Sequence, residues 1–423
     1  MLDKKLSKIY EDILINELIV ARGCTEPISL ALSSAKLMEI KREIPLNIEA
    51  YISGNIIKNV QGVIIPKTNN HKGVIPSLLV GLIVGDTSYN LDILSKFNED
   101  KISKLDQLIL KDIIHVNLAK SCKNLYIELE ATYLDNDKVT IIIEDFHNNF
   151  TLIKHNEDII YSKHDLIKKK KEEYNYLNVN DIYEFANNVN LDRIKPYLER
   201  QIEYNYEIAK EGIKNKYGSM IGKIIIDHSN NNVKEIAKAY TSAASDARMA
   251  GCNLPVVIIS GSGNQGLTTS VPLIVYANYY NISHEKLLRS LILSDLIALE
   301  EKKDIGRLSA FCGAISAGIA SSSAIAYMLE DNLEAIKHTI INGLALASGI
   351  ICDGAKASCA GKIALALESG LLGYYMYKNN SNIHAGDGII KETCDETIKS
   401  VGRLAKKGMK QTDKEILNIM IEK

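Results

Sequence analysis

Apolar positions recur at helical spacing over the first part of the chain, where residues 2–20 predict an amphipathic helix that stops near 21–23. Thr25 can cap a second helix, with Glu26 in its first turn, that runs to about Ile40. Cys24 therefore stands directly before a helix N-terminus.

After residue 44 the spacing of apolar residues changes to β-rich or alternating runs separated by turn signals, which predicts strands. These runs are 47–52, 62–65, 113–116, 126–132 and 139–143. A helical segment at 75–84 interrupts the series. The pattern predicts a sheet-containing domain that follows the first two helices.

Helical spacing returns for the rest of the chain, first in the charged segment 165–216 and then in a long helix over 232–250. Beyond it the sequence is rich in Ala, Gly and Ser, which allows close helix packing. The predicted fold class is α+β. A mainly helical catalytic domain is built from both ends of the chain, 1–44 and 222–423, and an α+β domain with charged helices, 45–221, is inserted between them.

Composition narrows the class of protein. A net charge of −2 gives no electrostatic basis for binding nucleic acid or an anionic membrane. The uncharged stretches 249–283 and 308–329 are long enough to cross a bilayer, but their Pro, Gly, Asn and Ser content favours buried segments of a soluble core. The run 168–171 is balanced by Glu172 and Glu173 and predicts a solvated helix face. Because the start has no apolar leader, we expect a cytoplasmic protein.

The seven cysteines include no C-x-x-C pair, which argues against a disulfide framework. Cys312, Cys352 and Cys359 lie in small-residue surroundings, and thiolates select zinc, copper(I) or iron–sulfur clusters. Zinc sites favour shorter ligand spacing, whereas a cluster tolerates this one. From spacing alone, three ordinary buried thiols remain an equal alternative.

Cys24 has a more specific setting, because the positive end of a helix dipole lowers the pKa of a thiol. Such a thiolate could act as a base, a nucleophile or a metal ligand, and a plain buried thiol is the alternative. None of the nine histidines forms a ligand-spaced pair.

The segment Ser-Gly-Ser-Gly-Asn-Gln-Gly at 260–266 follows a strand-like run at 255–259. Its glycine spacing matches a dinucleotide fingerprint, but Pro272 is expected to break the helix that this fingerprint requires. We favour a loop that presents backbone N–H groups and Ser260, Ser262 and Asn264 to a carboxylate, with a plain turn as the alternative.

Taken together, five segments resemble the L-cysteine desulfidase family, which is related to the iron–sulfur L-serine dehydratase α chain. They are Gly-Cys-Thr-Glu-Pro at 23–27, the loop at 260–266, Phe-Cys-Gly-Ala at 311–314, Cys-Asp-Gly-Ala-Lys at 352–356, and Gly-Met-x-x-Thr-Asp at 408–413. They occur in family order and span nearly the whole chain.

The resemblance implies an oxygen-sensitive [4Fe–4S] cluster held by Cys312, Cys352 and Cys359, with one iron left open, and Cys24 as the general base. Cys359 is the least certain ligand, because the serine dehydratase relatives have a wider gap before it. The family resemblance and the chemistry of the loop together predict six residues that bind substrate: Thr25, Glu26, Ser260, Ser262, Asn264 and Gln265. Cys122, Cys252 and Cys394 match no motif and are expected to be structural.

The implied activity is the non-redox β-elimination of L-cysteine to sulfide, ammonia and pyruvate. Three alternatives stay open: L-serine dehydration by the same machinery, a pyridoxal-phosphate lyase with Lys356 as its lysine, and a non-enzymatic metal-binding protein. The expected partner is a small amino acid, with no nucleic acid and no membrane, and homo-oligomerisation stays open.

Overall fold

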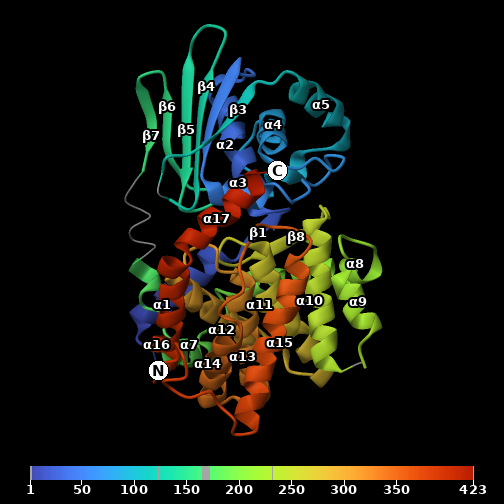
Figure 1. The fold of residues 1–423 in the computed structure, drawn as a ribbon, viewed down its shortest axis with the longest axis vertical. Helices are drawn as coiled ribbons and strands as arrows, with labels where there is room; N and C mark the ends of the chain where they lie inside the picture. The colour runs from blue at the N-terminus through green and yellow to red at the C-terminus, as the bar shows by residue number, and fades with distance from the viewer. Residues whose placement is uncertain (1, 122, 164–171, 231, 423) are drawn as a thin grey trace.

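A six-stranded sheet with its covering helices and a larger helical assembly form the two parts of the molecule, stacked along its long axis (Figure 1). The computed structural model describes residues 2–121, 123–163, 172–230 and 232–422. Cys122 and the lysine run 168–171 lie outside the described residues, so the predictions made for them stay predictions.

The sheet has the strand order β3-β2-β4-β5-β6-β7. Only β2 and β3 run parallel; the remaining neighbours are antiparallel. Alternate residues of β2 are buried, Ile48, Ala50 and Ile52 among them, because they face the helices that cover the sheet. The strands are β2 (Asn47–Ile52), β3 (Ile114–Leu118), β4 (Tyr126–Thr132), β5 (Lys138–Glu144), β6 (Phe150–His155) and β7 (Asp158–Ser162).

Helix α2 packs against β4, β5 and α4, and α4 also contacts β3. The approach of α4 to α2 is close because a Cβ atom at Gly81 would lie 2.0 Å from the carbonyl oxygen of Ala31. The helices of this part are α2 (Thr25–Lys41), α3 (Gly54–Val60), α4 (Val74–Val84) and α5 (Ile102–Leu110), with 3₁₀ turns η1 (Asn90–Lys96) and η2 (Glu99–Lys101).

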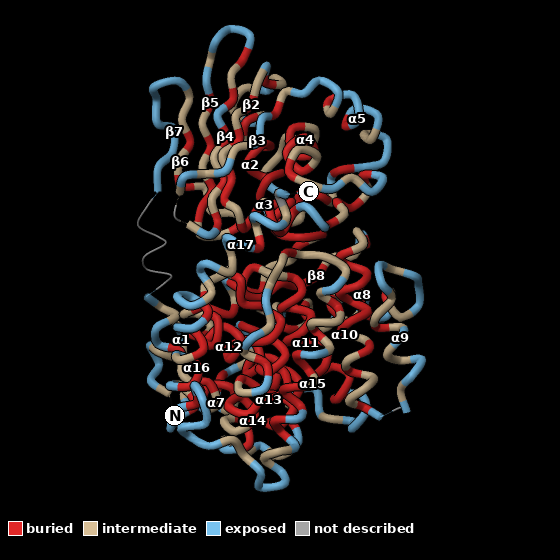
Figure 2. The backbone as a smooth tube through the Cα atoms, in the orientation of Figure 1, coloured by how far each residue is buried: buried red, intermediate tan, exposed pale blue. Residues whose placement is uncertain are grey.

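In the helical part, α13 is the central helix, buried from Ala314 to Met328 and packed against α11, α12, α14 and α15 (Figure 2). A two-stranded antiparallel ribbon of β1 (Ile19–Arg22) and β8 (Pro255–Ile258) packs against α8 and α11. The helices are α1 (Lys4–Glu17), α7 (Val179–Asn188), α8 (Lys195–Lys214), α9 (Ile221–Asp227), α10 (Val233–Met249), α11 (Gly263–Tyr280), α12 (His284–Lys303), α13 (Gly313–Glu330), α14 (Leu333–Ala347), α15 (Cys359–Lys378), α16 (Cys394–Arg403), the π-helical turn η3 (Leu404–Gly408) and α17 (Lys410–Ile421).

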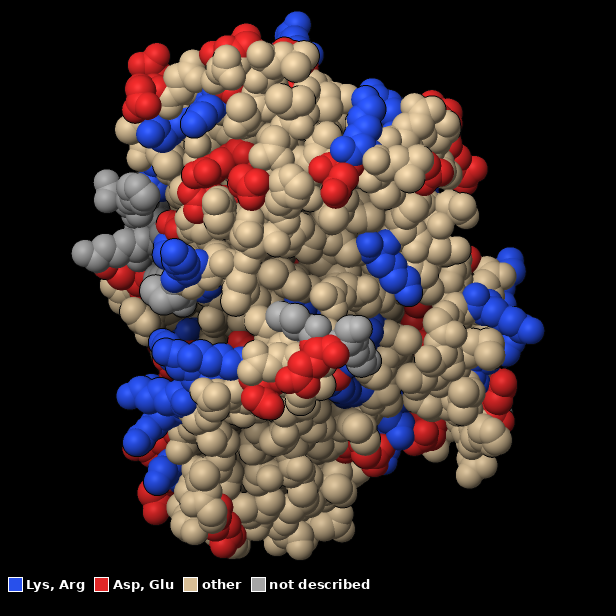
Figure 3. All heavy atoms as spheres, turned by 45° about the horizontal axis from the view of Figure 1, so that its top comes forward, with Lys and Arg blue, Asp and Glu red and all other residues tan. Residues whose placement is uncertain are grey.

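The last helix, α17, returns to the sheet-containing part and packs on α3 where the two parts meet (Figure 1). The inter-part contact is therefore made by elements from opposite ends of the sequence. Lys and Arg side chains are interspersed with Asp and Glu on the face shown in Figure 3, in keeping with the small net charge.

The predicted α+β class, mainly helical, is confirmed. The strands at 47–52 and 126–132 and the helix at 232–250 are confirmed almost residue for residue, whereas 62–65 forms only one isolated bridge, between Ile64 and Lys72. The first predicted helix is shorter, because its last residues join β1. Among the described residues, no helix combines the length and apolar character needed to span a membrane.

The prediction that Pro272 breaks a helix is wrong, because α11 continues through it from Gly263 to Tyr280. The glycine-rich loop therefore does connect a strand, β8, to a helix, α11. However, β8 pairs only with antiparallel β1, so the parallel βαβ unit of a dinucleotide site is missing from the described chain. The bounds 45–221 for an inserted domain stay a prediction. Helix α2, which lies before residue 45, packs on the sheet, and α8, which lies before residue 221, packs on α10 of the helical part.

Replacing Gly212 by Ala is expected to destabilise the protein by about 1–3 kcal/mol, because overpacking forces packed elements apart. A Cβ atom there would lie 2.1 Å from the carbonyl oxygen of Ala243, where α8 crosses α10. Gly361→Ala in α15 is the matched control, since its Cβ would meet nothing closer than 3.5 Å. Chemical denaturation measures the free energy of unfolding of both variants. Equal losses of stability in the two would contradict the packing argument.

Candidate functional site

One cavity of about 90 Å³ brings together residues from six separate segments of the chain. It lies between α2 and α3 of the sheet-containing part and the first turns of helices in the helical part. All four cysteines that the sequence singled out line it: Cys24, Cys312, Cys352 and Cys359. So do the predicted substrate residues Thr25, Glu26, Ser262, Asn264 and Gln265.

Cys24 is the N-cap residue of α2 and is buried, with 3% of its surface exposed. Its Sγ donates to Oε2 of Glu26 at 3.2 Å. Glu26 is also held from another direction, since Asn59 Nδ2 donates to Oε1 at 3.0 Å, and Thr25 Oγ1 lies 3.2 Å from Oε2. His147 Nε2, from the sheet-containing part, lies 3.7 Å from Oε1. Cys24 and Glu26 therefore form a fixed pair at the cavity wall.

The glycine-rich loop connects β8 to α11 and reaches the same wall. Ser260 and Gly261 both have positive φ, 50° and 71°, which turns the chain sharply before Ser262 caps α11 by accepting from Gln265 N. Thr25 Oγ1 donates to the carbonyl oxygen of Gly261 at 2.9 Å and so ties the start of α2 to this loop.

Cys312 and Cys352 lie on two short extended segments that form a bridge between Phe311 and Ile351. The amide of Cys312 donates to Ile350 O at 3.1 Å, and that of Cys352 to Ala310 O at 2.6 Å. In this antiparallel register Cys312 lies opposite Ile350 and Cys352 opposite Ala310, so the two cysteines are diagonal neighbours across the bridge. Cys359 is the first residue of α15, and its Sγ lies 3.7 Å from the carbonyl oxygen of Gly354.

Four long helices begin at this cavity. Cys24 caps α2, Ser262 caps α11, Cys312 caps α13, and Cys359 opens α15. A helix N-terminus carries a partial positive charge and free N–H groups, so it attracts anions. Their convergence favours a negatively charged occupant, either thiolates bound to a metal centre or a carboxylate.

The segment between Cys352 and Cys359 is clamped to the sheet-containing part. Lys58 of α3, almost fully buried, donates to the carbonyl oxygen of Cys352 at 3.1 Å and to Asp413 Oδ1 of α17 at 2.7 Å. Gly354, with φ 100°, passes so close to α3 that a Cβ atom would lie 2.5 Å from Lys58 O. Asp413, which belongs to the C-terminal motif at 408–413, thus positions the cysteine loop through Lys58.

The expected low pKa of Cys24 is wrong. Burial first, and then the Glu26 carboxylate, raise the pKa of this thiol well above its usual value, while Arg248 opposes the change. Burial and the adjacent charge thus outweigh the helix dipole. Burial alone would raise the pKa of Glu26, but the neighbouring His147 and the hydrogen bond from Cys24 lower it to about 2. Glu26 is therefore ionised and Cys24 protonated in the free protein.

The three other thiols interact with one another. Burial, followed by the charges of Cys352 and Cys359, raises the pKa of Cys312, and burial also raises that of Cys359, with Cys352 contributing. Burial lowers the pKa of Lys302 to about 8, and the thiols of Cys352 and Cys312 oppose this shift. Clustered thiols with a buried lysine beside them suit a site whose ligands become anionic only when metal binds.

No three His, Cys, Asp or Glu side chains of the described residues converge closely enough to hold a single metal ion. An iron–sulfur cluster is larger, and its thiolate ligands bind different irons. The donor chemistry, three thiols from two segments around one cavity, therefore fits a cluster better than a mononuclear site.

Sequence reasoning missed several residues that line the cavity, among them Asn59, Arg248, Lys302 and Arg307. Arg248 is the only arginine in the Ala- and Ser-rich helix α10, and this was the available signal. Nothing in the local sequence pointed to Asn59.

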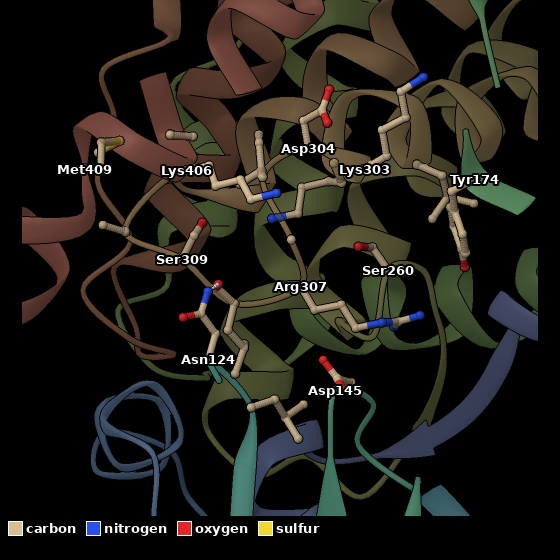
Figure 4. Close-up of a pocket in the computed structure, with 18 of the residues that line it drawn as sticks. Asn124, Asp145, Tyr174, Ser260, Lys303, Asp304, Arg307, Ser309, Lys406 and Met409 are labelled. Atoms are coloured by element: carbon tan, nitrogen blue, oxygen red, sulfur yellow. Dashed lines mark hydrogen bonds between the residues drawn. The ribbon is translucent and has the colours of Figure 1, made fainter. Parts of the chain in front are cut away.

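Ser260, predicted to bind substrate, lines a larger neighbouring cavity of about 710 Å³. The two cavities share the wall formed by Lys302, Arg307 and the residues after it. In Figure 4, Asn124 and Asp145 from the sheet-containing part face Arg307 and Ser309 from the helical part across this space. It lies beside the cysteine-lined cavity, at the junction of the two parts.

Fold and site together define a cysteine-lined centre built at the N-termini of buried helices. Residues 88–418 match the model of the family described as "Serine dehydratase alpha chain", and the chain belongs to this family. The matched residues include the loop at 260–266 and the three clustered cysteines, but not Cys24.

Curated relatives cover nearly the whole chain and share the printed name "UPF0597 protein". The relative from Finegoldia magna is 47% identical over 98% of this chain and 100% of its own length. Those from Desulfitobacterium hafniense and Treponema denticola are 42% and 41% identical, over 97% and 100% of this chain and 96% and 99% of their own.

Replacing Glu26 by Gln is expected to lower the pKa of Cys24, because the substitution removes the carboxylate charge that disfavours the thiolate. The pH dependence of Cys24 alkylation in the iron-free protein, followed by peptide mass spectrometry, measures this change. Glu39→Gln, on the same helix but paired with Lys36 and Thr87, is the control. An identical alkylation profile in Glu26→Gln and wild type would refute the electrostatic coupling.

Proposed function

We propose that this chain is an L-cysteine desulfidase, a carbon–sulfur lyase that converts L-cysteine and water to pyruvate, ammonia and hydrogen sulfide. The observation that carries the proposal is the convergence of Cys24, the three clustered cysteines and the serine/asparagine loop on one buried cavity. Membership of the serine dehydratase alpha chain family supports a lyase of this general kind.

In this proposal Cys312, Cys352 and Cys359 hold a [4Fe–4S] cluster, and Lys302 and Lys362 lie near enough to influence the thiols electrostatically. When bound, the cluster would supply a Lewis-acidic iron without a protein ligand, which stabilises negative charge on the departing sulfur. Lys58 and Asp413 keep the carbonyl oxygen of Cys352, and hence this ligand loop, in place.

Cys24 is the proposed base that takes the α-proton of the substrate. In the free protein the charge of Glu26 disfavours its thiolate. Pairing of the substrate ammonium group with Glu26 would neutralise this charge and leave burial as the remaining penalty, so the pKa of Cys24 would fall and its proton would pass to water before the thiolate takes the α-proton. Loss of the α-proton and of the sulfur gives 2-aminoacrylate, and hydrolysis of its imine tautomer gives pyruvate and ammonia.

Dehydration of L-serine is the second candidate, because the matching family is described by that activity. The same residues would serve, with a hydroxyl group departing in place of the sulfur. A pyridoxal-phosphate lyase receives less support, since Lys356 is paired with Asp353 and does not line the cavity.

Serine substitution of Cys312, Cys352 or Cys359 is expected to remove most of the bound iron and sulfide, because the hydroxyl is a poor substitute for a soft thiolate. Iron and sulfide analysis of anaerobically purified protein measures the loss. Cys252→Ser, a buried thiol outside the cavity, is the matched control and should keep its iron. Wild-type protein that contains no iron would end the cluster hypothesis.

Cys24→Ala is expected to retain iron but to lose roughly 100- to 10,000-fold in kcat, the usual contribution of a general base. Pyruvate formation by the iron-loaded variant provides the measurement. Full activity of this variant would refute the assignment of Cys24 as the base.

Comparison of kcat/KM for L-cysteine and L-serine on reconstituted wild-type protein separates the two candidate functions. We expect L-cysteine to be preferred, because a thiolate is the softer partner for iron. A clear preference for L-serine would replace the desulfidase proposal by the dehydratase.

A further inference from the structure

Arg248, near the end of α10, is a buried cation without an anionic partner. Only 2% of its surface is exposed, and Nη1 donates to Asn264 Oδ1 at 3.1 Å. Its Nε and Nη2 groups are buried and have no hydrogen-bond partner. No carboxylate of the described residues forms an ion pair with it, and its one hydrogen bond goes to the neutral amide of Asn264.

A buried guanidinium group is costly unless its donors are satisfied, so an unpaired one calls for an explanation. Arg248 lines the cavity and is close enough to Cys24 and Cys359 to influence both thiols. Gly263 makes room for it: a Cβ atom there would lie 2.3 Å from Arg248 Nε. The guanidinium group therefore lies against the first residue of α11, where a helix N-terminus also favours an anion.

A matching acceptor faces the same cavity. Asn59 donates through Nδ2 to Glu26, which fixes the orientation of its amide and leaves Oδ1 buried and unpaired. One wall thus offers unpaired N–H donors and another offers an unpaired oxygen beside the Glu26 carboxylate. A zwitterion with a carboxylate and an ammonium group would satisfy both.

We propose that Arg248 is the anchor for the substrate α-carboxylate, and that Asn59 Oδ1 and Glu26 receive the α-ammonium group. The proposal rests on the proposed function in that the substrate is an α-amino acid. It goes further by assigning recognition of the carboxylate to a forked, two-donor contact. Arg248, with Asn264 beside it, thereby selects amino acids over simple amines.

The test is a comparison of ligands with and without the carboxylate. L-Alanine has no leaving group, and ethylamine is the same molecule without its carboxylate. Calorimetric titration of the anaerobic holoprotein with each ligand gives two dissociation constants. Their ratio, ethylamine over L-alanine, is the carboxylate preference. We expect wild type to prefer L-alanine and Arg248→Gln to lose roughly 10- to 100-fold of that preference, the range for a lost charge-assisted contact.

Two further variants separate binding from structure. Gly263→Ala should push the guanidinium group aside without removing its charge and should lose part of the preference. Arg193→Gln removes an exposed arginine that pairs with Glu11 and Asp12, far from the cavity lining, and should change nothing. Arg248→Gln should keep its iron and unfold at no lower a temperature than wild type, because the change removes an unpaired buried charge.

The outcomes distinguish this inference from the proposed function. Binding of L-alanine that depends on Arg248, without turnover of L-cysteine or L-serine, supports the anchor and contradicts the lyase. Turnover with an undiminished carboxylate preference in Arg248→Gln overturns the anchor and leaves the lyase. If Arg248→Gln loses iron and unfolds at a lower temperature but keeps the carboxylate preference, Arg248 has a structural role and the anchor is overturned. Failure of the wild-type protein to bind L-alanine also overturns the anchor.

Discussion

The convergence of four helix N-termini on one buried cavity is the constraint on which the rest of the site depends. Helices α2, α11, α13 and α15 each direct their free N–H groups and partial positive charge toward the same space. Such an arrangement is unfavourable when no anion is present. It accounts for the thiols and the ionised Glu26 at the helix ends, and for the carboxylate that we propose to bind there, because each brings negative charge to the partial positive charge of the helices.

The junction between the two parts holds this arrangement together. Lys58 links α3, the carbonyl oxygen of Cys352 and Asp413 of α17, so one buried ammonium group joins three distant segments. Gly354 lets the cysteine loop pass directly over α3. Because Cys24 and Glu26 enter from α2 while the other cysteines belong to the helical part, the relative placement of the parts sets the distance between proposed base and proposed ligands.

Much of the site was predictable from local sequence. Cysteines next to small residues, and a serine/asparagine loop after a short apolar run, mark positions where chain turns meet helix starts. The prediction failed where the surroundings decide. The pKa of Cys24 depends on burial and on Glu26, and the helix through Pro272 persists because surrounding helices bury it. Ser260 lines the neighbouring cavity because two successive positive φ angles turn the loop between it and Ser262.

By itself, the sequence determined the fold class and most strands and helices, since these follow from periodicity; the candidate ligands came from the family resemblance, because spacing alone left three buried thiols as an equal alternative. Only the tertiary structure decided which of these residues share a cavity. Arg248 and Asn59 lie 189 positions apart in the chain and sit on different parts of the molecule. Their unpaired donors and acceptor become recognisable only when packing removes water from both, because a polar group that is solvated in the open chain shows no lack of a partner.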